Sequence, residues 1–318
     1  MTVLIISALA DIHARAVLEA LAARGHTDTE LLDLAEYPTR MTLSMEFQCG
    51  CKRFWLRRPG IADLDLSTIH AVWWRRPQAF ILPPQVKDPG HQRFALSEAT
   101  TAFQGLYQSL EVTWINQPGR DSAANHKPWQ LTVAQRIGLT IPDTLMTSDP
   151  DAAREFWQRH SGAVIYKQFI ALPDLWRETR RLRPNEEEFV EHIRIAPVIF
   201  QRYVDAVADI RVIIIGDTIF AAAADVRGAD YPDDVRMNLN ATYAPHQLPK
   251  SVRQHLFALM GAMGLTYGAA DLRLTSEGEY VFLEINPAGQ FLYIELATGQ
   301  PIAAALAREL TARTDEAC

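Results

Sequence analysis

The sequence predicts a mixed α/β fold, with parallel strands near the amino terminus and antiparallel hairpins in the carboxyl-terminal half. The continuous apolar run TVLIIS (2–7) is typical of a strand that is buried on both faces. Helical spacing follows in DIHARAVLEALAARG, and TELLDL is a second short strand, which completes a β-α-β unit and favours a parallel sheet. Further along, DIRVIIIG and TIFAAAADV share Gly216-Asp217, which predicts a two-residue hairpin turn.

Caps and breakers predict the other elements in chain order. AVWWRRP and EVTWINQP are strand-like segments that end at proline, and we expect Trp73, Trp74 and Trp114 in a core or an interface. A helix begins within HKPWQLTVAQRIG, with Pro128 as its first residue, and ends at Gly138. The polar stretch LWRETRRLRPNEEEF is predicted to be a helix or a mobile loop. The remaining predicted strands are AVIYKQF, VIFQRYV, GAADLRLT and EYVFLEIN, and the remaining predicted helices are QHLFALMGAMGL and PIAAALARELTAR.

Length and charge limit the possible classes of protein. A chain of 318 residues suits two or three domains, and we expect boundaries near residues 118 and 200. The net charge of -7 argues against binding to nucleic acid or to an anionic membrane. No apolar run is long enough to span a bilayer. The first residues lack the basic region and cleavage site of a signal peptide, so we interpret them as a strand.

The cysteines indicate a reducing compartment. Their number is odd, with Cys49, Cys51 and Cys318 in the whole chain, and we therefore expect a cytoplasmic protein. Cys49 and Cys51 could supply two ligands to a metal, but no second Cys or His pair lies near them in the sequence. Two ordinary thiols are the simpler interpretation.

Several common nucleotide and hydrolase motifs are absent from the sequence. Ser7-Ala8-Leu9-Ala10 stands where a dinucleotide-binding fold needs its glycines. There is no GxxxxGK[ST] motif, no kinase glycine loop and no G-x-S-x-G nucleophile elbow. A phosphate site in this chain would therefore have to be built from residues that are separated in the sequence.

The hairpin formed by GAADLRLT and EYVFLEIN concentrates acidic groups. If Glu277-Gly278 is its two-residue loop, Asp271 lies opposite Glu284; a four-residue loop gives the same register, and a three-residue loop would break it. Side chains alternate between the two faces of a strand. The polar face is predicted to hold Asp271, Arg273, Glu284 and Asn286, and the apolar face Leu272, Leu274, Val281, Leu283 and Ile285.

Two carboxylates that face each other need a cation, or one of them must take up a proton. With an amide oxygen beside them, they suit Mg²⁺ that is held jointly with phosphate oxygens. The alternative is a solvated polar face of an edge hairpin, on which Arg273 pairs with the acids.

Separated basic residues could supply the phosphate contacts. Lys127 stands at the predicted start of a helix, where backbone N–H groups favour an anion. Lys167 lies within a predicted strand, where lysine is under-represented, and Arg211 lies in DIRVIII. The small side chains of residues 221–224 would allow a ligand to approach closely. Taken singly, each lysine is better explained as an ordinary surface residue.

This combination resembles that of the ATP-grasp ligases. Residues 267–299 (YGAADLRLTSEGEYVFLEINPAGQFLYIELATG) are similar to the carboxyl-terminal signature of the branch that crosslinks microviridin-type precursor peptides, the graspetides. The resemblance also covers AVWWRRP, HKPWQL, IGLTIPDTL, VIYKQF, and FQRYV followed by DIRV, and so spans most of the chain. It implies an ATP-grasp fold with an amino-terminal β-α-β pre-ATP-grasp domain (1–118), a central subdomain (119–200) and a carboxyl-terminal subdomain with the magnesium-binding hairpin (201–318).

The resemblance also implies a role for individual residues. ATP phosphates would contact Lys127 and Lys167, adenine would meet Gln201, Tyr203 and Val204, and magnesium would be bound by Asp271, Glu284 and Asn286. Arg211 would face the phosphates or an acyl-phosphate, and the candidate catalytic residues are Arg211, Lys167 and Arg273. Asp225 and Arg227 resemble an Asp-x-Arg pair near the acceptor side.

Two departures from the family pattern affect the nucleotide site. Arg202 stands where many relatives carry a glutamate in the hinge, which leaves the ribose contacts open. No glycine occurs between Lys167 and Gly216, so a glycine-rich loop over the phosphates is missing.

The implied activity is an ATP-dependent ligation through an acyl-phosphate that forms ester or amide crosslinks between side chains of a precursor peptide. The expected partner is an acidic peptide with Thr, Ser or Lys acceptors, and a homodimer is possible. Residues 176–189 could close over the site, and Arg177, Arg180, Arg181 and Arg183 could guide the peptide. The alternatives are a ligase of free amino acids or small peptides, and an ATP-binding module that has lost catalysis.

Overall fold

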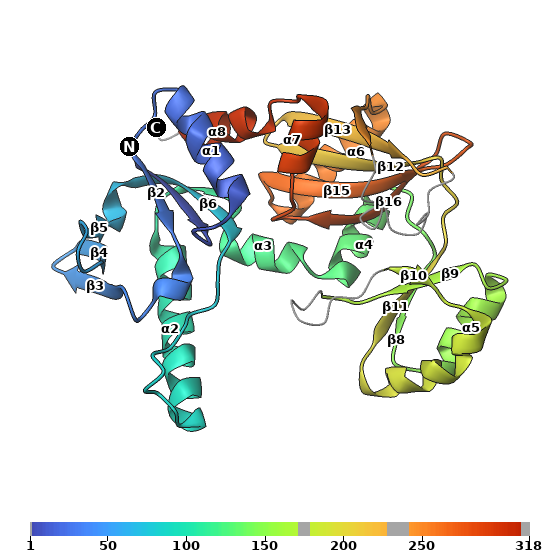
Figure 1. The fold of residues 1–318 in the computed structure, drawn as a ribbon, viewed down its shortest axis with the longest axis horizontal. Helices are drawn as coiled ribbons and strands as arrows, with labels where there is room; N and C mark the ends of the chain where they lie inside the picture. The colour runs from blue at the N-terminus through green and yellow to red at the C-terminus, as the bar shows by residue number, and fades with distance from the viewer. Residues whose placement is uncertain (1, 171–178, 228–241, 313–318) are drawn as a thin grey trace. The chain divides into compact units, whose positions relative to one another are not determined.

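The computed structural model describes residues 2–170, 179–227 and 242–312 (Figure 1). The chain divides into two compact units. The first unit comprises Met1–Asp121, Leu265–Tyr267 and Pro301–Cys318, and the second comprises Ser122–Gly264 and Gly268–Gln300. None of the helices in the described ranges is both long and apolar enough to cross a membrane.

A four-stranded parallel sheet forms the centre of the first unit. Its order is β2-β1-β6-β7, and every neighbouring pair is parallel. The strands are β1 (Thr2–Ser7), β2 (Thr29–Leu32), β6 (Ile69–Arg76) and β7 (Thr113–Ile115). Helix α1 (Ile12–Ala23) joins β1 to β2, as the sequence predicts, and β1 is buried along its whole length. The carboxyl-terminal helix α8 (Ile302–Thr311) returns to pack on α1 and β6.

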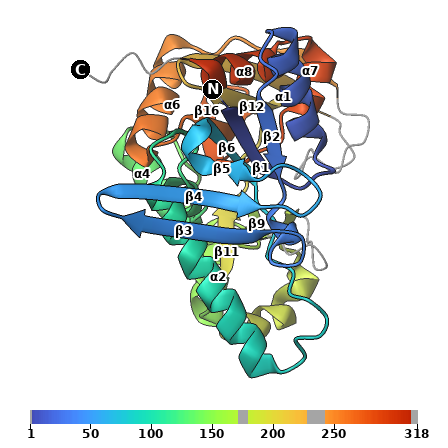
Figure 2. The ribbon, with the colours of Figure 1, turned by 90° about the vertical axis from the view of Figure 1, so that its left-hand side faces the viewer.

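A second, three-stranded sheet and a long helix complete the first unit (Figure 2). The strands are β3 (Thr42–Gln48), β4 (Cys51–Arg57) and β5 (Leu64–Asp65), the short 3₁₀ helices are η1 (Leu34–Glu36) and η2 (Leu66–Thr68), and the long helix is α2 (Pro89–Ser109). Cys49 and Gly50 form the β3–β4 turn with φ values of 43° and 85°, so Cys49-Gly50-Cys51 marks a hairpin. Both thiols are exposed, and no group of three or more His, Cys, Asp or Glu side chains within the described ranges could hold a metal.

The smaller sheet of the second unit is antiparallel, in the order β10-β9-β11-β8. Its strands are β8 (Thr144–Thr147), β9 (Val164–Lys167), β10 (Arg180–Arg181) and β11 (Val198–Arg202). Helix α5 (Pro150–Arg159) and the 3₁₀ helix η3 (Pro184–Ile195) pack against it through a buried apolar cluster that includes Phe156 and Ile193. The arginine-rich stretch predicted as a helix or loop therefore contributes a strand, because Arg180 and Arg181 pair with β9.

The larger sheet of the second unit has the order β14-β13-β12-β15-β16. Its strands are β12 (Ala208–Ile215), β13 (Thr218–Asp225), β14 (Tyr243–Pro245), β15 (Tyr267–Leu274) and β16 (Tyr280–Asn286). The nearby helices are α3 (Pro118–Ala124), α4 (Lys127–Arg136), α6 (Lys250–Met263) and α7 (Leu292–Thr298). Ile215 pairs with Thr218 and Gly216 has φ 53°, which confirms the predicted two-residue turn.

The β15–β16 hairpin reaches the predicted pairing by a different route. Its loop has three residues, because the Thr275 N–H donates to the Glu279 carbonyl (3.0 Å), and Gly278 has φ 83°. That loop pairs Leu272 with Phe282, and a bulge at Leu283 then brings Asp271 opposite Glu284. The prediction that a three-residue loop would break this pairing was wrong.

The bulge also corrects the predicted apolar face of the hairpin. Cross-strand partners share a face, so Phe282 lies with Leu272, and Val281 lies with Arg273. Leu283, which was expected on the apolar face, instead lines a pocket.

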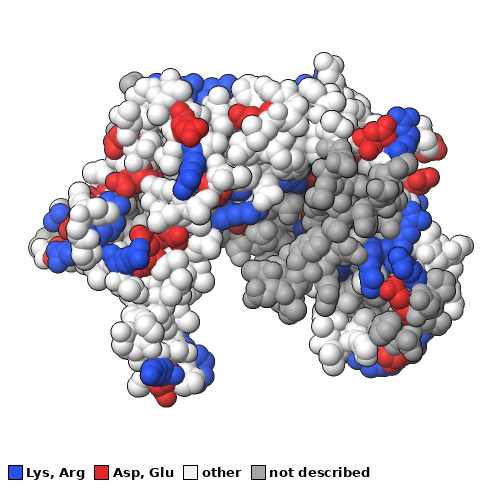
Figure 3. Space-filling model, in the orientation of Figure 1, with Lys and Arg blue, Asp and Glu red and all other residues white. Residues whose placement is uncertain are grey.

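Basic and acidic side chains are intermixed on the face seen in Figure 3. This distribution agrees with the low net charge of the chain.

Candidate functional site

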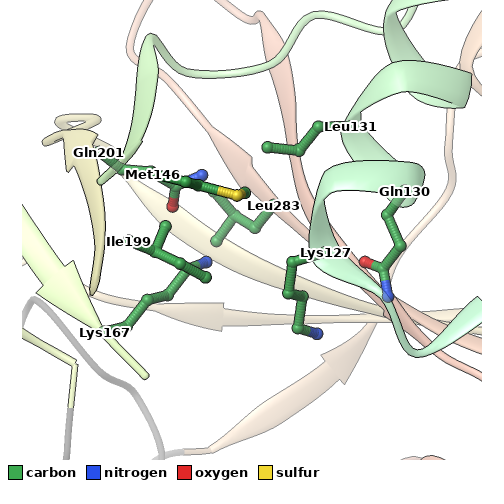
Figure 4. Close-up of a pocket in the computed structure, with 8 residues that line it drawn as sticks. All are labelled: Lys127, Gln130, Leu131, Met146, Lys167, Ile199, Gln201 and Leu283. Atoms are coloured by element: carbon green, nitrogen blue, oxygen red, sulfur yellow. The ribbon is translucent and has the colours of Figure 1, made fainter. Parts of the chain in front are cut away.

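A pocket in the second unit lies between helix α4 and strands β8, β9, β11 and β16 (Figure 4). Its empty volume is about 180 Å³, which includes space that is open to solvent. The lining residues are Lys127, Gln130, Leu131, Met146, Lys167, Ile199, Gln201 and Leu283.

Helix α4 presents Lys127 to the hairpin. The helix begins at Lys127, one residue before the predicted first residue Pro128. The Lys127 Nζ lies 2.7 Å from the Glu284 Oε2, and the two side chains are only 14% and 22% exposed. Lys127 and Glu284, which are far apart in the sequence, thus form a partly buried ion pair.

Glu284 remains ionised because of its neighbours. Burial by itself would raise the pKa of this carboxyl. The positive charges of Lys127 and Lys167 and the hydrogen bonds from Lys127 and Asn286 together outweigh burial and hold the pKa of Glu284 well below its usual range. Lys167 stands on β9 opposite Ile199 and extends into the pocket (Figure 4).

A second ion pair lies on the same hairpin. The Arg211 Nη1 donates to both Asp271 oxygens at 2.8 Å, and its Nη2 donates to the Gln290 carbonyl at 3.0 Å. The Asn286 Nδ2 donates to Glu284 (3.1 Å) and lies 3.4 Å from Asp271. The hairpin acids are therefore paired with Lys127 and Arg211, which corrects the alternative that Arg273 pairs with them.

Arg273 instead holds the segment that follows β11. Its Nε donates to Asp209 (2.8 Å), its Nη1 donates to the Val204 carbonyl (2.8 Å), and its guanidinium lies 5.3 Å from the centre of the Tyr203 ring. Burial lowers the pKa of Arg273, but the charge of Asp209, its hydrogen bond to Arg273 and the contacts with Tyr203 together outweigh burial, so the pKa is raised overall. These are the contacts of a positioning residue, and a catalytic role for Arg273 stays a prediction.

The predicted adenine contacts lie at the end of β11. Gln201 is 1% exposed, and its Nε2 donates to the Thr144 hydroxyl at 3.0 Å. Its Oε1 is buried and has no hydrogen-bond partner among the described residues. Val204 is buried. The Arg181 guanidinium lies over the Tyr203 ring, with its carbon 3.8 Å from the ring centre.

Arg202 lies on the other face of β11 from Gln201, because successive side chains alternate. Its Nε is 4.0 Å from the Asp143 carboxylate, and its side chain is half exposed. The residue that departs from the family pattern therefore does not line the pocket.

Asp225 and Arg227 form an exposed pair at the end of β13. The Arg227 side chain and backbone N–H both donate to the Asp225 carboxylate, which lowers the pKa of Asp225 to about 2. Neither residue lines the pocket. A role on the acceptor side stays a prediction.

Two members of the predicted arginine cluster contact different neighbours in the described structure, and a role of the cluster in guiding a peptide stays a prediction. Arg180 pairs with Glu186 (2.8 Å) and contacts Tyr166, whereas Arg181 stacks on Tyr203. Arg177 and the first part of the predicted closing segment 176–189 lie outside the described residues.

Sequence reasoning missed Gln130, which is 1% exposed and bonds the backbone of β16. The available signal was its spacing: Gln130 precedes Val133 and Ala134 by three and four residues, so it lies on the same buried face of the helix.

Comparisons with known proteins assign both parts of the chain. Residues 2–122 match the family model of the MvdD pre-ATP grasp domain, and residues 125–310 match that of the RimK-like ATP-grasp domain. No curated protein matches the chain.

Solved structures of peptide-modifying enzymes share the fold over nearly the whole chain. Macrocyclase MdnC from Microcystis aeruginosa MRC, bound with precursor peptide MdnA, has a TM-score of 0.87 at 29% identity, covering 98% of this chain and 100% of that one. A RiPP-associated ATP-grasp ligase from Chryseobacterium gregarium, in complex with ADP and a leader and core peptide, has a TM-score of 0.86 at 25% identity. The match covers 97% of this chain and 96% of that one. Macrocyclase MdnB from Microcystis aeruginosa MRC has a TM-score of 0.82 at 28% identity, covering 98% of this chain and 99% of that one.

These matches confirm the resemblance to peptide-maturing ATP-grasp enzymes and the mixed α/β fold that it implies. The chain belongs to the ATP-grasp family, with an MvdD-type pre-ATP-grasp domain followed by a RimK-like ATP-grasp domain.

Proposed function

We propose that the protein is an ATP-dependent ligase that activates a side-chain carboxylate of a precursor peptide and joins it to a hydroxyl or amine of the same peptide. The observation that carries the proposal is the convergence of Lys127 and Lys167 on Glu284, at the edge of a pocket that also holds Gln201. The similar enzymes MdnC and the Chryseobacterium gregarium ligase, which are bound to precursor or leader and core peptides, support a peptide substrate.

The residues that line the pocket support a role in binding the base of ATP. A buried carbonyl oxygen without a partner is costly, and the Gln201 Oε1 would accept a hydrogen bond from the exocyclic amine of adenine. Met146, Ile199 and Leu283 supply apolar walls for the rings. Tyr203 and Val204 come two and three residues after Gln201 and would border the base. Lys127, Lys167 and Arg211 would then bind the phosphates.

The hairpin acids fit magnesium that is shared with phosphate oxygens. Asp271 and Glu284 offer carboxylate oxygens, and Asn286 would serve as a ligand by presenting its amide oxygen. Two acids and one amide do not make an all-protein cage, and Mg²⁺ is usually held by one or two carboxylates together with substrate phosphates. When bound, the ion would neutralise charge on the transferred phosphoryl group.

The proposed reaction has two balanced steps. A peptide carboxylate oxygen attacks the γ-phosphorus of ATP, which forms an acyl-phosphate and releases ADP. A hydroxyl or amine then attacks the acyl carbon, loses its proton and displaces phosphate, which leaves an ester or an amide. Lys127, Lys167 and Arg211 would hold the phosphates in line and screen their charge, which is the main protein contribution to phosphoryl transfer.

The two alternative functions differ in what they predict. A ligase of free amino acids would turn over without a precursor peptide. A module that has lost catalysis would bind ATP and release no ADP, but Lys127, Lys167, Asp271 and Glu284 are all residue types that catalysis can use. A cytoplasmic location, an acidic peptide and a homodimer stay predictions.

The decisive experiment incubates the purified protein with MgATP and candidate precursor peptides rich in Thr and Asp or Glu. We expect ADP and phosphate to form, and the peptide to lose the mass of one water for each crosslink. Lys127→Ala should abolish both signals, whereas Lys250→Ala, a change at an exposed lysine at the start of α6, should retain them. Turnover of free amino acids, or ATP binding without any ADP, would replace the proposal with the corresponding alternative.

A further inference from the structure

Gln130 links the helix that carries Lys127 to the strand that carries Glu284. It lies on α4 three residues after Lys127, so the two side chains project from neighbouring turns of one helix. The Gln130 side chain is almost completely buried at 1% exposure. Gln130 lines the pocket. The β16 residues proposed to bind magnesium are Glu284 and Asn286. The hydrogen bonds of the Gln130 side chain in the described structure go to other residues.

The amide group of Gln130 makes three hydrogen bonds, all to backbone. Its Nε2 donates to the carbonyls of Ala124 (2.7 Å) and Ile285 (2.7 Å). Its Oε1 accepts from the Ile285 N–H at 3.0 Å. A primary amide pairs here with both backbone groups of one residue, as a neighbouring strand would.

The bonded residue stands between the two proposed magnesium ligands. Ile285 lies between Glu284 and Asn286 on β16, the edge strand of the larger sheet. The free edge of an outer strand has no strand to fix its position. On this edge of β16, the Gln130 side chain bonds the backbone of Ile285. The Phe282 N–H donates to the Thr140 carbonyl at 2.8 Å.

We propose that Gln130 is a positioning residue that sets the separation between the Lys127 ammonium and the Glu284 carboxylate, and thereby the affinity for MgATP. The inference rests on the proposed function, because it assigns Lys127 to phosphate and Glu284 to magnesium. The reason is geometric: one rigid amide fixes both the helix turn that carries Lys127 and the strand residue next to Glu284. A displacement of about 1 Å in such a site can cost about a hundredfold in rate.

The direct test measures the dissociation constant of a non-hydrolysable ATP analogue with magnesium, together with the free energy of unfolding. Gln130→Leu keeps the approximate volume and removes all three bonds. Gln130→Glu keeps the bond from the Ile285 N–H and replaces the two donated bonds by repulsion from carbonyls. We expect both variants to bind the analogue at least about tenfold more weakly than wild type. Because Gln130→Glu retains one bond, it remains informative if Gln130→Leu does not fold.

Asn116→Leu is the matched control. Asn116 is also 1% exposed, and its amide makes three backbone bonds, accepting from Thr266 and Tyr267 N–H and donating to the Tyr267 carbonyl (2.8 to 2.9 Å). Its loss should destabilise the fold by a similar amount and leave the affinity for the analogue unchanged. Equal losses of affinity in the control and in the Gln130 variants would assign Gln130 a purely structural role.

A double-mutant cycle with Lys127 separates positioning from general damage. If Gln130 acts through Lys127, Gln130→Glu should weaken binding in the wild type but add almost nothing in a Lys127→Ala background. Additive effects would overturn the inference. A wild-type protein that binds no nucleotide, or crosslinks no peptide, would contradict the proposed function instead, whereas normal wild-type binding with unaltered Gln130 variants would contradict only the inference.

Discussion

Glu284 carries its charge in surroundings where burial opposes ionisation, and two lysines offset that cost. The pairing of Glu284 with Asp271 was predicted correctly, although the bulge at Leu283 and not the assumed loop brings the two residues opposite each other. The place of its partner Lys127 at the start of a helix was predictable from the neighbouring Pro128. The ion pair between them was not, because it depends on how α4 packs on β16, which neither segment encodes locally.

For Glu284→Gln, we expect a near-complete loss of ADP formation and a moderate loss of stability at neutral pH. The change removes the proposed magnesium ligand and leaves Lys127 without its carboxylate partner. Because the pair is partly exposed, the stability cost should be about 1–3 kcal/mol. Urea unfolding and a coupled ADP assay measure the two effects, and unchanged magnesium-dependent turnover would remove the hairpin from the mechanism.

The stability cost of this substitution should depend on pH in one direction. The pKa of Glu284 is lower in the folded chain than in the unfolded chain, where a glutamate titrates near about 4.3. The stability that ionised Glu284 contributes is therefore present above that value and is lost as the pH falls through the lower folded pKa. The difference in unfolding free energy between wild type and Glu284→Gln should be full at neutral pH and should shrink in acid; a difference that grows in acid would contradict the assignment.

At the scale of elements, strands and helices with strong periodicity or clear caps were predictable, including β1, α4 and the Gly216-Asp217 turn. The β15–β16 hairpin shows what was not. The loop length and the bulge at Leu283 compensate each other, so the pairing of Asp271 with Glu284 was correct although the assumed loop was wrong. A bulge arises from the packing of both strands and leaves no reliable sign in either one.

The turn after β16 is packed too tightly for any side chain at Gly289. A Cβ there would lie 2.3 Å from the Ala269 Cβ and 2.9 Å from the Arg211 Nη2. We therefore expect Gly289→Ala to displace Arg211 from Asp271, to lower the free energy of unfolding by about 1–3 kcal/mol and to reduce ADP formation.

Gly278→Ala is the control for this turn, because a Cβ at Gly278 meets nothing within 4 Å. Its positive φ should still cost about 1 kcal/mol, but turnover should stay at the wild-type level. Thermal unfolding and steady-state kinetics compare the two variants. If both lose activity equally, close packing at Gly289 does not hold Arg211 in place.

At the scale of the whole molecule, the first unit is not contiguous in the sequence. Its parallel sheet begins at β1, but α8 is the last described helix of the chain and packs on α1 and β6. The helix itself was predictable from PIAAALARELTAR, whereas its return to the first unit was not, because an amphipathic helix does not encode which sheet it covers. The division into three parts at residues 118 and 200 stays a prediction.

Leu306→Asp tests the dependence of the first unit on α8. Leu306 is completely buried, and a charge there should destabilise the first unit by about 3–5 kcal/mol. Ala304→Asp places the same charge on the exposed side of the same helix and should have little effect. Urea unfolding followed by tryptophan fluorescence compares them, since Trp73, Trp74 and Trp114 all lie in the first unit. Equal unfolding curves for the two variants would show that the first unit folds without α8.

On the proposed function, the two ion pairs of the site, Lys127 with Glu284 and Arg211 with Asp271, would make ligand binding an exchange of partners. A phosphate oxygen that bonds Lys127 replaces Glu284, and this leaves a half-buried carboxylate without its counter-charge, which is costly. A divalent cation on that carboxylate would likewise leave Lys127 without an anion. On the proposed function, nucleotide and cation relieve each other's cost, so each should raise the affinity for the other by the same factor.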